Sequence, residues 1–146
     1  MSQENVELVV GLPFYTGDVD AVPVVRDPEL YAAWVEAVTP LFHEDVESAF
    51  PGLLGGGETH TGIEGFATAW VNWLSAWASY RISLTESIDC DNQIVTCYDV
   101  PAVPTGSSGE VKLSGADVWT VRDGKIARWE GYGSRAKALK AVGLEE

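Results

Sequence analysis

The segment from Tyr80 to Tyr132 constrains the fold most, because its apolar and polar residues alternate instead of recurring at helical spacing. Three turn signals interrupt this pattern: Asp91-Asn92, the stretch 105–109, and Asp123-Gly124. Pairs such as Asp-Gly are typical of the two-residue turns that join antiparallel strands. The sequence therefore predicts four long antiparallel strands in succession.

Helical patterns surround this strand region. Asp27-Pro28-Glu29 predicts a helix start, with a cap residue, a proline at the first helical position and an acid near the positive end. Thr61 and Glu64 have the spacing of a capping box at the start of a second long helix. Other expected elements are a short helix at 2–10, a loop at 11–26, a strand at 43–50 and a closing helix at 134–142.

Length and charge limit the possible function classes. A chain of 146 residues predicts a single domain spanning 1–146, and helices followed by long antiparallel strands indicate the α+β class. The net charge of −13, with nine scattered basic residues, argues against a nucleic-acid or membrane partner. The residues 1–5 lack the basic segment and long apolar run that are typical of a secretion signal, and Cys90 and Cys97 lack metal-site spacing. We expect a cytoplasmic protein with a small apolar ligand and no cofactor or metal.

The strand from Glu110 to Arg122 has one polar residue on its otherwise apolar odd-numbered face, Asp117. Alternation therefore predicts that Asp117 points inward. If Asp123-Gly124 forms a regular two-residue turn, Trp119 pairs with Arg128 and Asp117 pairs with Glu130. Directly opposed side chains lie about 5 Å apart, so two carboxylates would meet with Arg128 diagonal to them.

Two acids at that separation can act as general acid and general base, with Arg128 setting their protonation. Trp119 and Tyr132 would share the face and contact an apolar ring. The alternative interpretation is a structural cross-strand ladder of ion pairs without catalytic role. Weaker candidates are His43, at a junction of helix and strand, and His60, in a glycine-rich loop. Tyr98 and Asp99 lie on opposite faces of a central strand, so at most one faces a pocket.

Several phrases of the sequence resemble the SnoaL-like branch of the nuclear transport factor 2-like superfamily. They are "MSQENVELV", "TGDVDA", "LFHEDVES", "GADVWTVRDGKIARWEGY" and "RAKALKAVGL". The resemblance implies a cone of strongly curved antiparallel sheet packed on helices around an internal pocket, often dimeric through the sheet. Members include polyketide cyclases, ketosteroid isomerases and limonene epoxide hydrolases, so the fold alone does not choose a reaction.

The resemblance also bears on single residues. Ketosteroid isomerase has a general-base Asp before a Pro on the strand after its second helix, and Phe50 before Pro51 stands there in this chain. Activity of the ketosteroid isomerase kind is therefore not expected, and Phe50 would line the pocket instead of acting as a base. If the final turn is one residue shorter here, Asp117 falls on the face of the isomerase oxyanion-hole acid, whereas many SnoaL-like relatives carry His there. Asp117, Arg128 and Glu130 also imitate the acid, Arg, acid set of limonene epoxide hydrolase by analogy.

The leading hypothesis is cofactor-free acid/base chemistry of the cyclase, isomerase or hydrolase type on a small apolar substrate. Its residues are Asp117, Glu130 and Arg128, with Trp119, Tyr132, Phe50 and Tyr98 as substrate contacts. A non-catalytic small-molecule binding protein is the alternative. A protein-interacting scaffold is a third reading, but the outward face has no apolar patch beyond Val118 and Trp129. A homodimer contact through these two cross-strand partners is the more economical explanation of them.

Overall fold

A computed structural model describes residues 2–12, 16–49 and 59–144. Five α-helices, one 3₁₀ helix and seven strands occur in this part of the chain. In chain order they are α1 (Ser2–Val10), β1 (Thr16–Asp20), α2 (Ala21–Arg26), α3 (Pro28–Val38), η2 (Thr39–Leu41), β2 (Phe42–Ala49), β3 (Thr59–Thr61), α4 (Gly62–Leu74), β4 (Trp77–Cys90), β5 (Gln93–Pro104), β6 (Val111–Arg122), β7 (Lys125–Tyr132) and α5 (Arg135–Ala141). The fold is α+β, as the sequence predicts.

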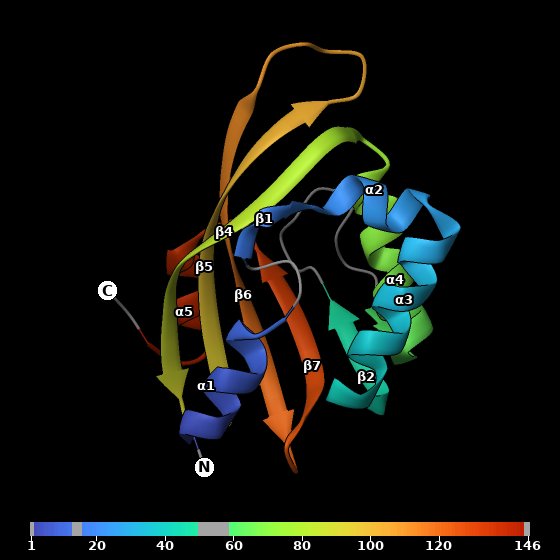
Figure 1. Ribbon diagram of the computed structural model, residues 1–146. Helices are drawn as coiled ribbons and strands as arrows, with labels where there is room; N and C mark the ends of the chain where they lie inside the picture. Colours follow the sequence, from blue (N-terminus) through green and yellow to red (C-terminus); the bar gives the residue numbers. More distant parts are fainter. Residues whose placement is uncertain (1, 13–15, 50–58, 145–146) are drawn as a thin grey trace.

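All seven strands form one sheet in the order β1-β4-β5-β6-β7-β2-β3. The four strands from β4 to β7 form an antiparallel meander, as expected from the three turn signals (Figure 1). The expectation of a wholly antiparallel sheet is wrong at one place, because β2 pairs with β7 in parallel. No short turn joins these two strands, so no local geometry imposes an antiparallel arrangement on them.

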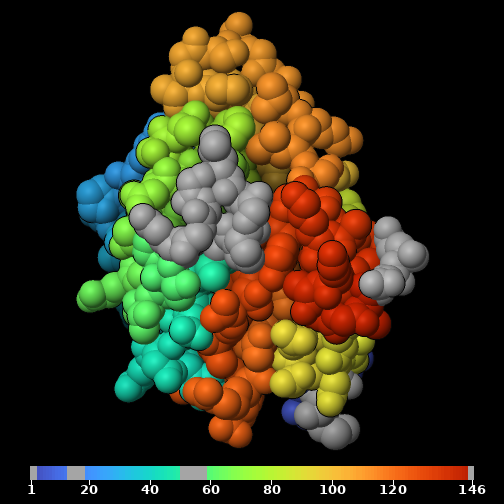
Figure 2. Space-filling view, turned by 180° about the vertical axis from the view of Figure 1, so that it is seen from behind, coloured from blue at the N-terminus to red at the C-terminus, as the bar shows by residue number. Residues whose placement is uncertain are grey.

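The two faces of the sheet have different coverings. Helices α2, α3 and α4 lie on one side of the sheet (Figure 1). Their buried side chains pack with those of the strands in the main hydrophobic core. We call this side the inner face. Helix α5 contacts β5, β6 and β7 on the opposite side, the outer face, where α5 and β7 lie side by side (Figure 2). A smaller apolar cluster there contains Val95, Cys97, Ala116, Val118 and Ala138.

Local signals explain the starts of α3 and α5. The Asp27 side chain accepts hydrogen bonds from the backbone of Glu29 and Leu30, with Pro28 opening α3. Ser134 caps α5 by accepting from the Lys137 backbone. The predicted capping box at Thr61 is wrong, because Thr61 makes no side-chain cap bond at the start of α4. Thr61 ends the strand β3 instead, and the chain then turns through Gly62 at φ +79°.

The predicted loop at 11–26 is also wrong in its second half, where β1 and α2 occur. The Asp20 carboxylate accepts a hydrogen bond from the Val22 backbone, which starts α2, and another from the Tyr80 backbone at the beginning of the meander. This contact spans 60 residues, and the pairing of β1 with β4 is equally non-local. No helix in the described ranges has the length and hydropathy to cross a membrane.

Candidate functional site

A β-bulge in the β6–β7 hairpin decides which side chains meet. The turn is the predicted one, with Asp123 at φ 53° and Gly124 at φ 77°, and Val121 pairs with Ile126. Beyond this pair the register shifts by one residue, so that Thr120 pairs with Arg128. A one-residue shift moves every following side chain to the other face of the sheet.

The predicted meeting of Asp117 with Glu130 and Arg128 is therefore wrong. Asp117 pairs with Gly131, whereas Glu130 pairs with Val118. Because Val118 belongs to the outer cluster, Glu130 and Arg128 lie on the outer face, and alternation leaves Asp117 on the inner face. The bulge separates the expected triad into one inner acid and an outer ion-pair network.

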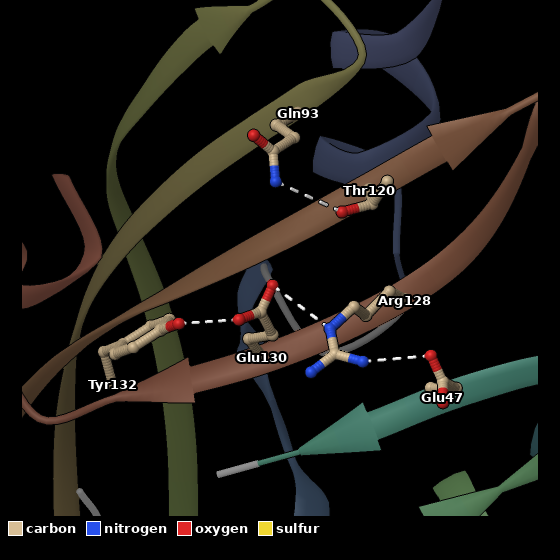
Figure 3. A network of polar contacts seen from close by, with 6 residues as sticks. All are labelled: Glu47, Gln93, Thr120, Arg128, Glu130 and Tyr132. Atoms are coloured by element: carbon tan, nitrogen blue, oxygen red, sulfur yellow. Dashed lines mark hydrogen bonds and ion pairs between the residues drawn. The ribbon is translucent and has the colours of Figure 1, made fainter. Parts of the chain in front are cut away.

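The outer network runs along β7 and reaches β2 (Figure 3). Arg128 bridges Glu47 at 3.0 Å and Glu130 at 3.3 Å, and the Tyr132 hydroxyl donates to Glu130 at 2.6 Å. The side chains of Arg128 and Glu47 are 36% and 51% exposed. Burial, together with the Glu130 hydrogen bond, raises the pKa of Tyr132 to about 12. An ion-pair ladder thus exists on the outer face, but it joins Arg128 to Glu47 and Glu130 and not to Asp117, and Tyr132 belongs to it instead of the Trp119 face.

The inner acid, Asp117, is 4% exposed and is the one buried charged residue in the described part of the chain. The Tyr98 hydroxyl donates to its Oδ1 at 3.4 Å across the β5–β6 pair. Gly115, the residue that pairs with Tyr98, makes this contact possible, because a Cβ there would lie 2.8 Å from the Tyr98 hydroxyl. The expectation that Tyr98 and Asp99 lie on opposite faces is confirmed: Tyr98 faces inward, whereas Asp99 accepts from Ser114 on the other face.

A second phenol, Tyr80 on β4, lies near the same carboxylate. Burial raises the pKa of Tyr80 to about 12, against a lowering by a hydrogen bond from Trp73, and the negative charge of Asp117 adds to the rise. Burial and the same charge hold the pKa of Tyr98 well above its usual range. Both phenols therefore keep their protons at neutral pH and can donate hydrogen bonds.

Stacked indole rings adjoin this polar group. Trp129 lies between Trp119 and Trp70, with ring centroids 5.5 Å away in each case and interplanar angles of 10° and 11°. The Trp119 indole donates to Thr96, which pairs with Asp117 across β5 and β6. The prediction that Trp129 forms an outward contact with Val118 is wrong, because the bulge turns Trp129 into the core.

The remaining sequence candidates have other surroundings. Phe50 lies outside the described residues. The His43 ring contacts the backbone carbonyl of Arg122 at 2.6 Å, which fixes the junction of β2 with the hairpin. His60 lies on β3, not in a loop. Sequence reasoning missed Tyr80, Thr96 and Ser48. Alternation along β5 could have indicated Thr96, since it shares the face of Tyr98. It could not have indicated Tyr80, because a register shift between Leu84 and Glu86 brings Tyr80 to the inner face.

The inner face combines hydrogen-bond donors and acceptors in one polar group. A carboxylate and two protonated phenols can accept and donate hydrogen bonds beside an apolar aromatic wall. Among the residues that the structure describes, no three His, Cys, Asp or Glu side chains gather as metal ligands would. The chemistry that these residues can supply is proton transfer and stabilisation of an oxygen by hydrogen bonds.

Comparisons with known proteins agree on the fold. A family model described as a SnoaL-like domain matches residues 29–129. A crystal structure of TerC with polyporic acid has a TM-score of 0.64 at 18% identity, covering 96% of this chain and 98% of that one. A proposed SnoaL-like polyketide cyclase from Jannaschia sp. CCS1 has a TM-score of 0.67 at 14% identity, covering 99% of this chain and 94% of that one. Bal32a, from a soil-derived mobile gene cassette, has a TM-score of 0.65 at 13% identity, covering 97% of both chains. A search of curated proteins found no match.

Proposed function

Because the chain belongs to the SnoaL-like domain family, we propose that it binds a small apolar molecule bearing a carbonyl or hydroxyl oxygen on the inner face of its sheet. The proposal includes cofactor-free proton transfer between that molecule and Asp117. Polyketide cyclase-type chemistry belongs to this class, and the likeness to TerC and to the proposed polyketide cyclase supports it at the level of the fold.

The burial of Asp117 carries the proposal. A carboxyl group that is 4% exposed on an otherwise apolar strand face is costly to bury, and buried ionisable groups of this kind gather at functional sites. The Tyr98 hydroxyl donates to this carboxylate at 3.4 Å, so a phenol and a carboxylate stand together where both would engage a ligand oxygen. Tyr98 would donate to the oxygen, and Asp117 would take or return the proton.

Binding without turnover is the second candidate, and one observation favours it. Glu130 and Arg128, the expected partners in acid/base work, lie on the outer face, so Asp117 is the single buried acid in the described part of the chain. Catalysis would then need Asp117 to serve as both base and acid in turn, with the phenols stabilising the oxygen. A protein that only binds its ligand needs no second acid.

One probe separates these candidates. The bicyclic ketone 2-tetralone has acidic protons next to its carbonyl, so its binding can be followed by tryptophan fluorescence and its proton exchange in D₂O by NMR. We expect binding with accelerated exchange, and Asp117→Asn should abolish the acceleration. Glu130→Gln, a matched change of a carboxylate on the same hairpin but the outer face, should leave binding and exchange unchanged.

The outcomes have separate meanings. Binding without accelerated exchange would support the non-catalytic candidate. No binding, or equal effects of Asp117→Asn and Glu130→Gln, would refute the assignment of the site to the inner face.

We further propose that the protein is a cytoplasmic homodimer paired through the outer face. Arg128 between Glu47 and Glu130 offers alternating charges that a symmetry-related copy could complement, and the two cysteines are free thiols, as in a reducing compartment. A monomer by light scattering at micromolar concentration would refute the dimer.

A further inference from the structure

Ser48 on β2 is a buried polar residue whose role the fold does not explain. It is fully buried, and its Oγ has no hydrogen-bond partner among the described residues. A buried hydroxyl without a partner costs free energy, because it has lost its bonds to water. Thr96, the other fully buried hydroxyl residue of the sheet, accepts a bond from Trp119 at 2.9 Å.

Strand register places Ser48 on the inner face. Ser48 pairs with Trp129, and the Trp129 ring lies in the main core. The next residue pairing along β7 sets Glu130 against Ala49, which leaves Gly131 diagonal to Ser48. On its other side Gly131 pairs directly with Asp117. Ser48 and Asp117 therefore flank Gly131 from the two strands that adjoin β7.

Gly131 contributes no side chain to the face between these two polar groups. The other glycine beside Asp117, Gly115, has its space taken by the Tyr98 ring. Neighbouring strands lie about 4.8 Å apart, so β6 and β2 are about 10 Å apart, and the two-residue offset of about 7 Å along the strands brings the backbones of Asp117 and Ser48 to about 12 Å. A flat bicyclic molecule with an oxygen at each end matches a span of this size.

From this geometry we infer that Ser48 is a ligand-binding residue, and that the ligand is an apolar ring system with two oxygen functions at opposite ends. The inference rests on the proposed function of the inner face. One oxygen contacts Asp117 and Tyr98, and the other exchanges a hydrogen bond with Ser48. The two polar positions then select for the separation of the oxygens.

The test compares two probes on three proteins. The probes are 2-tetralone, with one oxygen, and 6-hydroxy-2-tetralone, with a second oxygen at the far end. We expect the parent protein to bind the hydroxyketone at least 5-fold more tightly, by fluorescence titration. Ser48→Ala should remove this preference and leave the affinity for 2-tetralone unchanged, whereas Asp117→Asn should lower the affinity for both probes.

A second measurement needs no ligand. Ser48→Ala should raise the melting temperature of the free protein or leave it unchanged, because it removes an unpaired buried hydroxyl. Thr96→Val, which removes a hydroxyl that has a partner, should lower it. A lowered melting temperature in Ser48→Ala would show that the hydroxyl is satisfied within the fold and would overturn the inference.

Failure of this inference differs from failure of the proposed function. If 2-tetralone binds through Asp117 but the parent shows no preference for the hydroxyketone, the Ser48 assignment is wrong and the inner site remains. If neither probe binds, the inner site itself is refuted, and the Ser48 assignment with it.

Discussion

Gly115→Ala tests whether the contact between Tyr98 and Asp117 depends on a missing side chain. A Cβ at residue 115 would lie 2.8 Å from the Tyr98 hydroxyl oxygen and 3.0 and 3.1 Å from two ring carbons. Real carbon contacts are not that short, so the ring must move away from β6. Overpacking of this kind costs about 1–3 kcal/mol. The alanine recovers roughly 0.5–1 kcal/mol, because glycine is unfavourable in a strand.

The net expectation is a loss of about 1–2 kcal/mol in the free energy of unfolding, measured by urea denaturation. In a chain of this length each kcal/mol corresponds to about 3 °C in melting temperature. Gly109→Ala is the matched control, because a Cβ there would meet only the Ser107 side chain, at 3.7 Å. It should leave stability unchanged or raise it slightly.

The double variant with Tyr98→Leu isolates the cause. Leucine removes the ring that the new Cβ would strike, so Gly115→Ala should cost little in that background, giving a coupling of about 1 kcal/mol or more. An equal loss in both backgrounds would show that the glycine is needed for another reason. A parent-like stability of Gly115→Ala would refute the geometry directly.

Three further predictions concern single contacts. Tyr80 has a pKa raised from 10.0 to about 12, so its contribution to stability is complete below pH 10 and is lost as the pH rises toward 12. Between pH 9 and pH 11 the free energy of unfolding of the parent, measured by urea denaturation, should therefore fall by about 1 kcal/mol more than that of Tyr80→Phe. Equal losses in the two proteins would contradict this. Thr96→Val should cost about 1–3 kcal/mol, because the buried Trp119 indole loses its acceptor, and an unchanged urea midpoint would argue against that bond. Glu47→Gln should lower the free energy of unfolding by less than about 1 kcal/mol, and the loss should shrink in high salt, because the ion pair between Glu47 and Arg128 is half exposed. A loss above about 2 kcal/mol would mean that the outer network is more than a surface ladder.

Elements defined by neighbouring residues could be predicted from the sequence. Asp27 caps α3 through backbone groups two and three residues away, and Asp123-Gly124 supplies the two positive φ angles of its turn. Strand β1 could not be predicted in this way. It pairs with β4 more than 60 residues later, and Asp20 is held by the Tyr80 backbone. Such partners leave no periodic signal in the strand itself.

The candidate site was predictable in part, for a related reason. Alternation along β6 correctly directs Asp117 inward, because that strand is regular from Val111 to Thr120. It fails on β7, where regular alternation from Ile126 would direct Arg128 and Glu130 into the core and Trp129 to solvent. Burying two charges and exposing an indole is much the less favourable arrangement. That imbalance was the available signal for a bulge between Ile126 and Arg128.

The same bulge connects stability with the proposed function. It lets Ile126 and Trp129 share the inner face, and Trp129 then stacks between Trp119 and Trp70. It also sets Gly131, in place of Glu130, opposite Asp117. Ala127 is the extra residue of the bulge, so its deletion should give a regular ladder that keeps Arg128 opposite Thr120 and Trp129 opposite Trp119. We therefore expect the deletion variant to fold with parent-like tryptophan fluorescence, because the same side chains stay on each face. A deletion variant that loses the buried tryptophan signal would refute this assignment of faces along β7.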